Sequence, residues 1–397
     1  MIIPSLRTDS PAAFRASADT LVSCHIAPHL TEWEANGGAT RRLFNVAGRA
    51  GVFRVPVPVS DGGLGLGLAH SVAFIRAVSR HAAGGVAASL CVQTHVAMPL
   101  LLGAGSDRQK HTWLPPLLNG SAITAVAITE PTGGSDLVNS TATWAVRAEE
   151  GWILSGEKTF ITNAPIADCL LVLARTDRGA GALGLTFFLV PTDLPGVEVR
   201  DLRTAGLRSS RTGHVRLTRC VLPQDAVLGR PGLAMVQLAR VLPEERLAIS
   251  AGVLECARCC VERTAARPAV ARSQTARAEL ARWLVEVEAA EAFLDAAVHR
   301  FDQGGGDRLD ADLIKTVSAR LTQRIVNGCA RLTGTDAFVG SPAGEGSLLP
   351  ALRDVRVLSV FGGSCETVRD SAAAEILRGA ATRRQTDSLS LAGGRPV

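Results

Sequence analysis

The spacing of hydrophobic and polar positions changes twice along this chain. Over residues 11–119 apolar residues recur at intervals of three and four, as Val72, Ile75 and Val78 do. This is the spacing of one face of an α-helix. The pattern therefore predicts an N-terminal helical domain over residues 1–120.

Between residues 121 and 230 the pattern changes to short runs rich in β-branched and aromatic residues, separated by turn residues. Residues 148–151, with the sequence Ala-Glu-Glu-Gly, predict a hairpin connection between two of these runs. The pattern indicates a middle antiparallel β domain over residues 121–232. The predicted strands are 123–129, 144–148, 152–155, 169–174, 185–190 and 214–222.

After residue 232 the helical spacing returns and continues to about residue 379. Four long helices joined by short links are typical of a bundle, and three glycines at 304–306 separate the second helix from the third. The predicted helices are 243–266, 273–302, 310–333 and 352–378. The predicted fold class is therefore α+β, with an N-terminal helical domain, a middle antiparallel β domain and a C-terminal four-helix bundle over residues 233–397.

Composition narrows the classes of function. The chain has 397 residues, of which 47% are hydrophobic, so it can bury a large core and form two or three domains. Its 42 basic and 37 acidic residues are mixed, which argues against nucleic acid as a partner, while the net charge of +5 suits an anionic cofactor. With no continuous apolar run of about 18 residues and no signal-peptide pattern, we expect a cytoplasmic protein that does not enter a membrane. The nine cysteines lack the paired spacing of a zinc site, and no metal is expected.

Two motifs in the middle segment contain candidate binding groups. The first ends a predicted strand at Thr129 and continues through Pro131 into a glycine-rich turn that exposes backbone N–H groups and hydroxyls. Such a turn can hold a polar ring edge or a phosphate, and it is also an ordinary loop in many proteins. The motifs are Ile128-Thr129-Glu130-Pro131-Thr132-Gly133-Gly134-Ser135-Asp136 and Gly156-Glu157-Lys158-Thr159-Phe160-Ile161-Thr162-Asn163.

Together with residues 105–115 and 353–364, these motifs resemble the acyl-CoA dehydrogenase superfamily in order and spacing, from about residue 60 to 380. The resemblance implies the three-domain fold, an FAD cofactor and oxidation of an acyl thioester. Most members have Trp where this chain has Phe160, so stacking on the flavin should persist with less area. The resemblance places Ile128 and Thr129 at the edge of the flavin ring, Gly134 and Ser135 at the pyrophosphate, and Phe160 and Thr162 at the far face of the ring.

The resemblance also implies that a second subunit completes the FAD site, and hence a homodimer or homotetramer. The match to the family is incomplete at two positions. Ala266 stands where members usually have Phe, three residues after Arg263, and Thr335 stands where they usually have the second Gly of a turn. Without the resemblance, Arg263 is better explained as part of a solvated helix face. The residues at the matching positions are Arg263, Gln274, Arg331, Gly334 and Thr335, and two more expected to touch FAD are Ser364 and Glu366.

Removing the α proton of a thioester requires a carboxylate. Most members of the family supply a Glu between an aromatic residue and a Gly, but this chain has Gly362 at that position. In the isovaleryl and long-chain branches the base is a Glu directly before an Arg on an earlier helix, and Glu245 before Arg246 matches that pattern. Burial against the flavin is expected to raise the pKa of Glu245.

Other roles follow from the same resemblance. The N–H of Gly362 is expected to polarise the thioester carbonyl, and Ser135 and Arg246 are expected at the substrate. The alternative for Glu245 is a favourable first-turn charge on a helix that opens at Pro243. The acyl pocket is expected between residues 91–98 and the helix that follows Arg246.

The leading hypothesis is α,β-dehydrogenation of a small or branched acyl thioester, with Glu245 as the base and flavin N5 as the hydride acceptor. CoA or a carrier protein holds the thioester, the latter as in secondary metabolism, and an electron-transfer flavoprotein is the expected acceptor of the electrons. Two alternatives stay open. One is a flavin-dependent monooxygenase of the same fold, against which Glu245 counts, because such enzymes need no α-proton base. The other is a noncatalytic paralogue.

Overall fold

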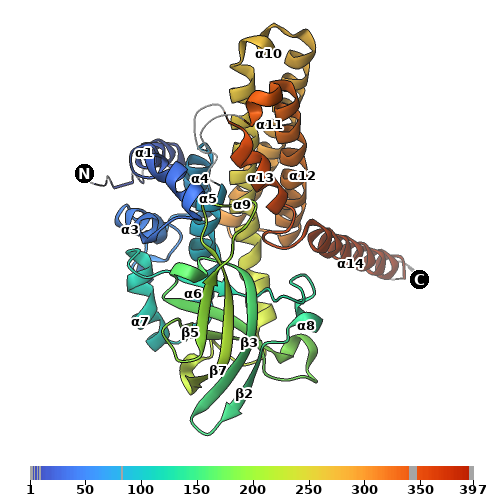
Figure 1. Cartoon of the computed structure of the whole chain (residues 1–397). Coiled ribbons are helices and arrows are strands. Elements are labelled where there is room, and N and C mark those ends of the chain that lie inside the picture. The colour runs from blue at the N-terminus through green and yellow to red at the C-terminus, as the bar shows by residue number, and fades with distance from the viewer. Residues whose placement is uncertain are drawn as a thin grey trace.

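The computed structural model describes residues 3, 5, 6, 8, 10–81, 84–338 and 347–392. The N-terminal domain is helical, as the apolar spacing predicts, and it packs beside the C-terminal helices at one end of the β domain (Figure 1). Its helices are α1 (Pro11–His25), α2 (Leu30–Asn36), α3 (Arg41–Arg49), α4 (Leu68–Ser79), α5 (Gly84–Cys91), α6 (Met98–Ala104) and α7 (Asp107–Leu118), with a π-helical turn (Val92–Ala97) between α5 and α6.

The stretch Gly84–Ala104, which runs from α5 to α6, is long and apolar enough to cross a membrane by length and composition alone. Within it, 89% of the most apolar window is buried inside the protein. The buried Gln93 accepts a hydrogen bond from Thr124 N at 3.1 Å and donates one to Leu117 O at 3.3 Å. These contacts are those of a core helix that packs between the helical domain and the β domain.

The middle domain is one sheet with the strand order β1-β4-β2-β3-β7-β6, and β5 pairs with β4. The pairs β2/β3, β3/β7, β4/β5 and β6/β7 are antiparallel as predicted, whereas β1 and β2 pair with β4 in parallel. The strands are β1 (Thr124–Ala127), β2 (Trp144–Ala148), β3 (Gly151–Thr162), β4 (Cys169–Arg175), β5 (Leu185–Pro191), β6 (Val197–Asp201) and β7 (Thr212–Pro223), with the short helix α8 (Leu137–Ser140) between β1 and β2.

Strand β6 was not predicted from the sequence. Only Val197 and Val199 are apolar among its five residues, and both pack against the sheet core, while Glu198 and Arg200 are exposed. The strand pairs on one side only, with β7. Such a short edge strand carries too weak an apolar signal to stand out from a loop.

The C-terminal segment is helical, with two differences from the prediction. The first long helix begins at residue 234 rather than 243, so Pro243 lies inside it. The predicted helix 352–378 is two helices separated by a loop, in which Gly362 (φ +68°) and Gly363 (φ +95°) adopt left-handed backbone. Figure 1 shows the last of these helices projecting from the body of the molecule. The helices are α9 (Ala234–Ala265), α10 (Pro268–Arg272), α11 (Gln274–Asp302), α12 (Arg308–Thr333), α13 (Leu349–Val357) and α14 (Cys365–Ala392).

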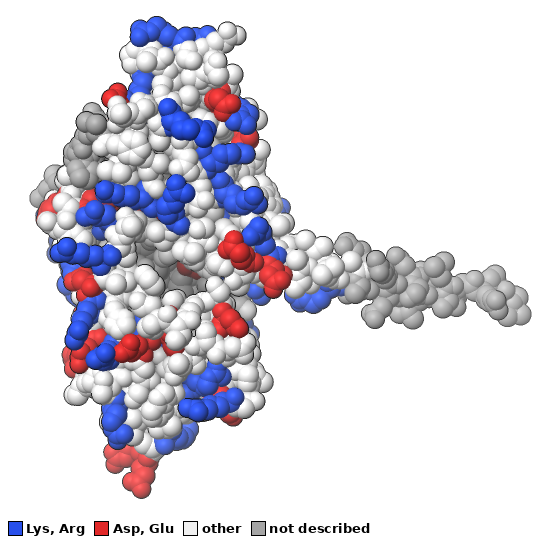
Figure 2. Space-filling view, turned by 45° about the vertical axis from the view of Figure 1, so that its right-hand side comes forward, with Lys and Arg blue, Asp and Glu red and all other residues white. Residues whose placement is uncertain are grey.

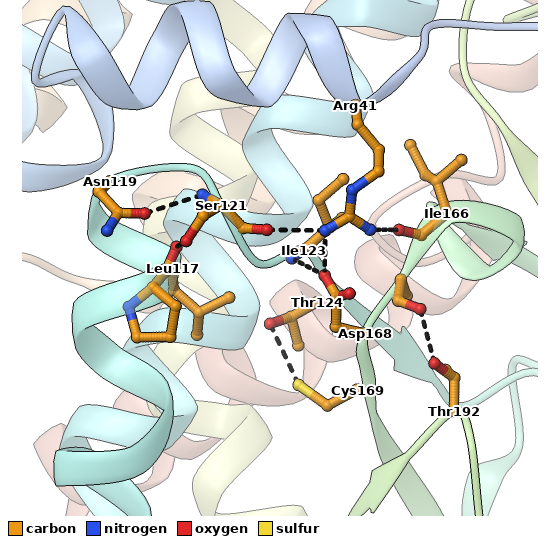
Figure 3. A network of polar contacts seen from close by, with 12 residues as sticks. Arg41, Leu117, Asn119, Ser121, Ile123, Thr124, Ile166, Asp168, Cys169 and Thr192 are labelled. Atoms are coloured by element: carbon orange, nitrogen blue, oxygen red, sulfur yellow. Dashed lines mark hydrogen bonds and ion pairs between the residues drawn. The ribbon is translucent and has the colours of Figure 1, made fainter.

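Polar contacts fix the helical domain to the β domain at the start of β1 and β4 (Figure 3). Arg41 at the start of α3 donates to Ser121 O at 2.7 Å and to Asp168 Oδ2 at 2.8 Å, and Ile123 N donates to the same carboxylate oxygen at 2.8 Å. Farther along, Gln109 Nε2 donates to Asp225 O at 2.7 Å. These contacts anchor the β domain to α3 and α7 of the helical domain.

Candidate active site

Helix α9 carries Glu245 into the interior. One face of α9 is buried before Pro243, through Ala234, Leu238 and Val241. This buried face continues to Glu245, which is only 5% exposed. The alternative of a first-turn surface charge is therefore wrong, because Glu245 lies eleven residues into the helix. Among the described residues, Glu245 Oε2 has no hydrogen-bond partner.

The environment of Glu245 brings its pKa close to neutral pH. Burial raises its pKa from 4.5 to about 7, against the opposing effects of the cations Arg246 and Lys315. Glu245 also lies close enough to the buried thiol of Cys91 to add to the effect of burial in raising the pKa of that thiol. A carboxyl group with a pKa near 7 is suited to accept and release a proton at neutral pH.

The loop between α13 and α14 explains how Glu245 and Gly362 are related. A Cβ atom on Gly362 would lie 3.8 Å from Glu245 Oε2 and 3.3 Å from Ile249 Cδ1. A longer acidic side chain at residue 362 would therefore enter the space beside the Glu245 carboxyl group, where two like charges repel. The structure brings together these two predicted site residues, which are separated by 117 positions in the sequence.

Buried cations hold the backbone of this glycine loop. Arg246 Nε donates to Gly362 O at 3.1 Å, and Lys315 Nζ donates to Gly363 O. Arg246 also forms a buried ion pair with Asp312, on the same face of α12 as Lys315. Both carbonyl oxygens of the loop therefore accept hydrogen bonds. The Gly362 N–H has no acceptor among the described residues and remains available to a ligand.

Sequence reasoning missed Lys315 and Asp312. Both are almost fully buried, at 2% and 0% exposed, and they are three residues apart on a helix whose neighbouring buried positions include Ala311 and Ile314. Charged residues at apolar positions of a helical repeat are a usable signal, because a buried charge needs a partner. Burial lowers the pKa of Lys315.

A second buried ion pair joins the two motifs of the β domain. Lys158 Nζ donates to Glu130 Oε1 at 2.7 Å and to Ile128 O at 3.0 Å, and Glu130 also accepts from the backbone N–H groups of Ala142 and Thr143. Burial lowers the pKa of Lys158 to about 8 despite Glu130. Burial alone would raise the pKa of Glu130, but Lys158 and the hydrogen bonds bring it below its ordinary value. The pair fixes the end of β1 against β3.

The surface formed by these motifs fits a flat, polar cofactor. Phe160 lies at an irregularity of β3, where the register with β7 shifts between Lys158 and Ile161, and its left-handed backbone (φ +56°) leaves it 64% exposed. Ile128, Thr129 and Thr162 are half-exposed beside it in the sequence motifs, and Gly134 and Ser135 are exposed. A Cβ on Gly134 would lie 2.8 Å from the Thr129 side chain, so only glycine allows this close turn. An exposed aromatic ring beside a narrow glycine turn is what stacking on a flavin would require.

The cofactor-side motif and Glu245 meet through α5. Asn163, three residues after Phe160, donates through Nδ2 to Ser89 O at 2.9 Å, and Cys91 on the same helix lies next to Glu245. Ser364 caps the start of α14 close to Gly362, where its Oγ accepts from Thr367 N. Glu366 is exposed and pairs with Arg369.

The remaining predicted cofactor residues lie at the other end of the bundle. Arg263 is eighteen residues beyond Glu245 on α9, about 27 Å along the helix at about 1.5 Å per residue. Arg331 is sixteen residues beyond Lys315 on α12, about 24 Å along it. This distant group gathers where α9 and α12 end and α11 begins, and it comprises Arg263, Gln274, Arg331, Gly334 and Thr335.

A mostly apolar pocket begins beside Glu245. Ile249 and Phe361 line it next to the base, Ala87 and Ala88 of α5 line one side, and Val253 of α9 lines the other. Of the predicted lining residues 91–98, only Cys91 lines this pocket, and the other lining residues on this side belong to α5. Figure 2 shows a hollow in the surface between the β domain and the bundle, with Lys and Arg side chains on the bundle above it.

Comparison with known proteins agrees with this geometry. Models of the acyl-CoA dehydrogenase N-terminal, middle and C-terminal domains match residues 8–121, 125–220 and 232–377. The chain belongs to the acyl-CoA dehydrogenase family. It is therefore an oxidoreductase of a flavoprotein family whose members act on acyl thioesters.

This acyl-CoA dehydrogenase homologue is 28% identical to the long-chain specific acyl-CoA dehydrogenase of Mus musculus, over 92% of the chain and 86% of that protein. It is 28% identical to the isovaleryl-CoA dehydrogenase of Oryza sativa subsp. japonica, over 91% of the chain and 90% of that protein. Its structure matches that of a glutaryl-CoA dehydrogenase from Mycobacterium smegmatis in complex with FADH2, with a TM-score of 0.84 and 26% identity, over 93% of this chain and 95% of that one.

Among the described residues, no three His, Cys, Asp or Glu side chains are grouped to hold a metal ion. The charged groups at the site serve other purposes: Arg246 and Lys315 hold the glycine loop, and Lys158 pairs with Glu130. Among the described residues beside the glycine loop, Glu245 is the buried carboxyl group that has no ion-pair partner.

Proposed function

We propose that this protein catalyses the FAD-dependent α,β-dehydrogenation of an acyl thioester, with Glu245 as the base that removes the α proton. The observation that carries this proposal is the buried, unpartnered Glu245 Oε2 beside a glycine at residue 362, close to a mostly apolar pocket. The similarity to a long-chain and an isovaleryl enzyme supports an acyl thioester as the substrate.

The protein's own groups divide the work. Glu245, with a pKa of about 7, takes the proton from the α carbon and can release it near neutral pH. The free N–H of Gly362 donates to the thioester carbonyl, which increases the acidity of the α carbon and stabilises the enolate as it forms. Arg246 and Lys315 keep this N–H in place by binding the loop carbonyls. FAD, when bound, supplies the acceptor for the hydride that leaves the β carbon.

The positions of the predicted cofactor residues support a site shared between two copies of the chain. Phe160 lies where the β domain meets α5, three residues before Asn163, whereas Arg331 and Thr335 lie at the distant end of the bundle. Since one chain cannot bring both groups to the same FAD, we propose that a second copy supplies the distant group. Exposed apolar side chains on α11 and α12 provide a surface for such a contact, and they include Leu284, Val285, Leu313 and Val317.

An anaerobic titration tests the proposed reaction. Purified protein loaded with FAD is mixed with a panel of thioesters, each prepared on CoA and on a carrier protein, and the flavin absorbance is followed. We expect bleaching by at least one thioester in the wild type and its loss in Glu245→Gln. Glu244→Gln is the matched control, because Glu244 is adjacent but half-buried and close to Asp302 instead of the pocket.

The outcomes separate the candidate functions. Native-rate bleaching in Glu245→Gln would refute Glu245 as the base. Formation of an oxygen adduct of the reduced flavin, without bleaching by any thioester, would favour a monooxygenase. Reoxidation of the bleached protein by an electron-transfer flavoprotein, compared with oxygen, then identifies the electron acceptor.

A further inference from the structure

The end of the pocket that lies away from Glu245 differs chemically from the end beside it. Cys256 lines it seven residues beyond Ile249 on α9, about 10 Å farther along the helix at about 1.5 Å per residue. Gly84 lines it at the start of α5, seven residues before Cys91, which lies next to Glu245. The pocket thus extends away from the base along both helices.

Two polar side chains reach the pocket at this far end. Ser79, the last residue of α4, places its Oγ 2.7 Å from where a Cβ on Gly252 would lie. Asp354 on α13 places Oδ2 2.5 Å from where a Cβ on Gly84 would lie. The two glycines leave the space that these oxygens occupy, and both polar residues line the pocket.

Asp354 is only half satisfied. Its Oδ1 accepts a hydrogen bond from Leu207 N at 2.6 Å, but its buried Oδ2 has no partner within the part of the chain that the structure describes. Asp354 is 5% exposed, and burial followed by the neighbouring Glu34 raises its pKa well above the ordinary value. Burial therefore favours the protonated form of Asp354, which can both donate and accept a hydrogen bond. Ser79, 4% exposed, likewise has no partner for its Oγ in the described residues.

We propose that this pocket selects acyl thioesters whose tail carries a hydroxyl group, which Asp354 and Ser79 bind at the far end. A hydroxyl can accept from one of these groups and donate to the other, whereas a hydrocarbon tail leaves both unpaired in an apolar surrounding. A carboxylate tail is disfavoured, because Glu34 already acts on Asp354 as a neighbouring acidic group. This inference rests on the proposed dehydrogenase function and specifies its substrate class.

The experiment compares matched pairs of acyl-CoA thioesters over a series of chain lengths, each with and without a terminal hydroxyl. Flavin bleaching gives kcat/KM, and isothermal titration calorimetry gives the binding affinity independently of turnover. At the best chain length we expect the hydroxyacyl thioester to be preferred about tenfold by the wild type. In Ser79→Ala this ratio should fall toward one, whereas Asp354→Asn should keep it, because the Asn amide can still donate to the hydroxyl as the protonated carboxyl group does.

The variants are chosen to retain the fold. Asn at residue 354 keeps an oxygen for Leu207 N, and Ser79→Ala removes a hydroxyl that makes no other hydrogen bond among the described residues. Ser71→Ala is the matched control, because Ser71 is on the same helix and has a buried, unpartnered Oγ but lines a separate small cavity. Its preference ratio should equal that of the wild type.

The results distinguish failure of the hydroxyl-tail assignment from failure of the dehydrogenase function. If plain and hydroxylated thioesters bleach the flavin equally well and Ser79→Ala does not change their ratio, the tail assignment is overturned and the dehydrogenase function stands. A stronger preference for an amino-terminated tail would also overturn the hydroxyl assignment. If no thioester bleaches the flavin, the proposed function fails and the tail assignment fails with it.

Discussion

Replacing Glu245 with Gln is expected to stabilise the folded protein at pH 8 while it removes activity. The native state holds the Glu245 carboxyl group in a buried site without a hydrogen bond to Oε2. At pH 8 that group is ionised, and its desolvation opposes folding. Gln has nearly the same shape and carries no charge, so the variant avoids this cost.

The magnitude follows from the pKa. An unfolded Glu loses its proton near pH 4.5, whereas folded Glu245 keeps it up to about pH 7. Between these values the unfolded state loses its proton first, so the free energy of unfolding decreases as the pH rises and stays lower above pH 7. At about 1.4 kcal/mol for each pH unit, the full effect is about 3 kcal/mol. The advantage of Gln should approach this value at pH 8 and be small at pH 5.

Chemical denaturation of wild type and Glu245→Gln at pH 5 and pH 8 measures the effect, with flavin bleaching recorded on the same samples. Glu149→Gln, an exposed change in the β2/β3 turn, is the control and should show no such pH dependence. If the difference between Glu245→Gln and wild type is the same at both pH values, the carboxyl group is not held with a raised pKa, and the reasoning is refuted.

Three further changes test other parts of the site. Lys158→Met should lower the free energy of unfolding by about 3 to 5 kcal/mol, measured by chemical denaturation, because it leaves the Glu130 charge buried without its partner. Gly362→Ala should lower the free energy of unfolding by about 1 to 2 kcal/mol, because residue 362 has left-handed backbone. The added methyl group would lie beside Ile249, and it should change kcat more than it changes KM. Phe160→Ala should leave stability almost unchanged, since the ring is 64% exposed, but it should weaken FAD retention measured by equilibrium dialysis. Phe160→Trp should strengthen FAD retention. Equal retention by the wild type and both variants would exclude stacking.

Local patterns predicted much of the fold. Strand β2 and the turn after it have the bounds that the apolar run and the Ala-Glu-Glu-Gly segment indicate, and α11 and α12 lie within two residues of their predicted limits. Periodicity and turn residues encode such elements because the forces involved act between near neighbours in the chain. The motifs around Thr129 and Phe160 likewise indicated the family from short segments.

The same local reasoning failed where distant contacts decide the outcome. Pro243 looked like the start of a helix, yet the buried residues from Ala234 onward keep α9 continuous through it. The helix predicted over 352–378 is broken by Gly362 and Gly363, whose loop is held from α9 and α12. At Pro243 tertiary packing outweighed a local preference against helix of about 3 kcal/mol. At residues 362–363 the two glycines and the contacts of the loop both favour the break.

By itself, then, the sequence determined the order of helical, β and helical segments and the chemical groups available in each motif. Only the tertiary structure decided that Glu245 is buried beside Gly362, that Lys315 and Asp312 support this loop, and that Asp354 and Ser79 line the same pocket. The reason is physical: a pKa, a pocket or an ion pair depends on which groups are near in space, and a periodic pattern carries no information about contacts between segments far apart in the chain.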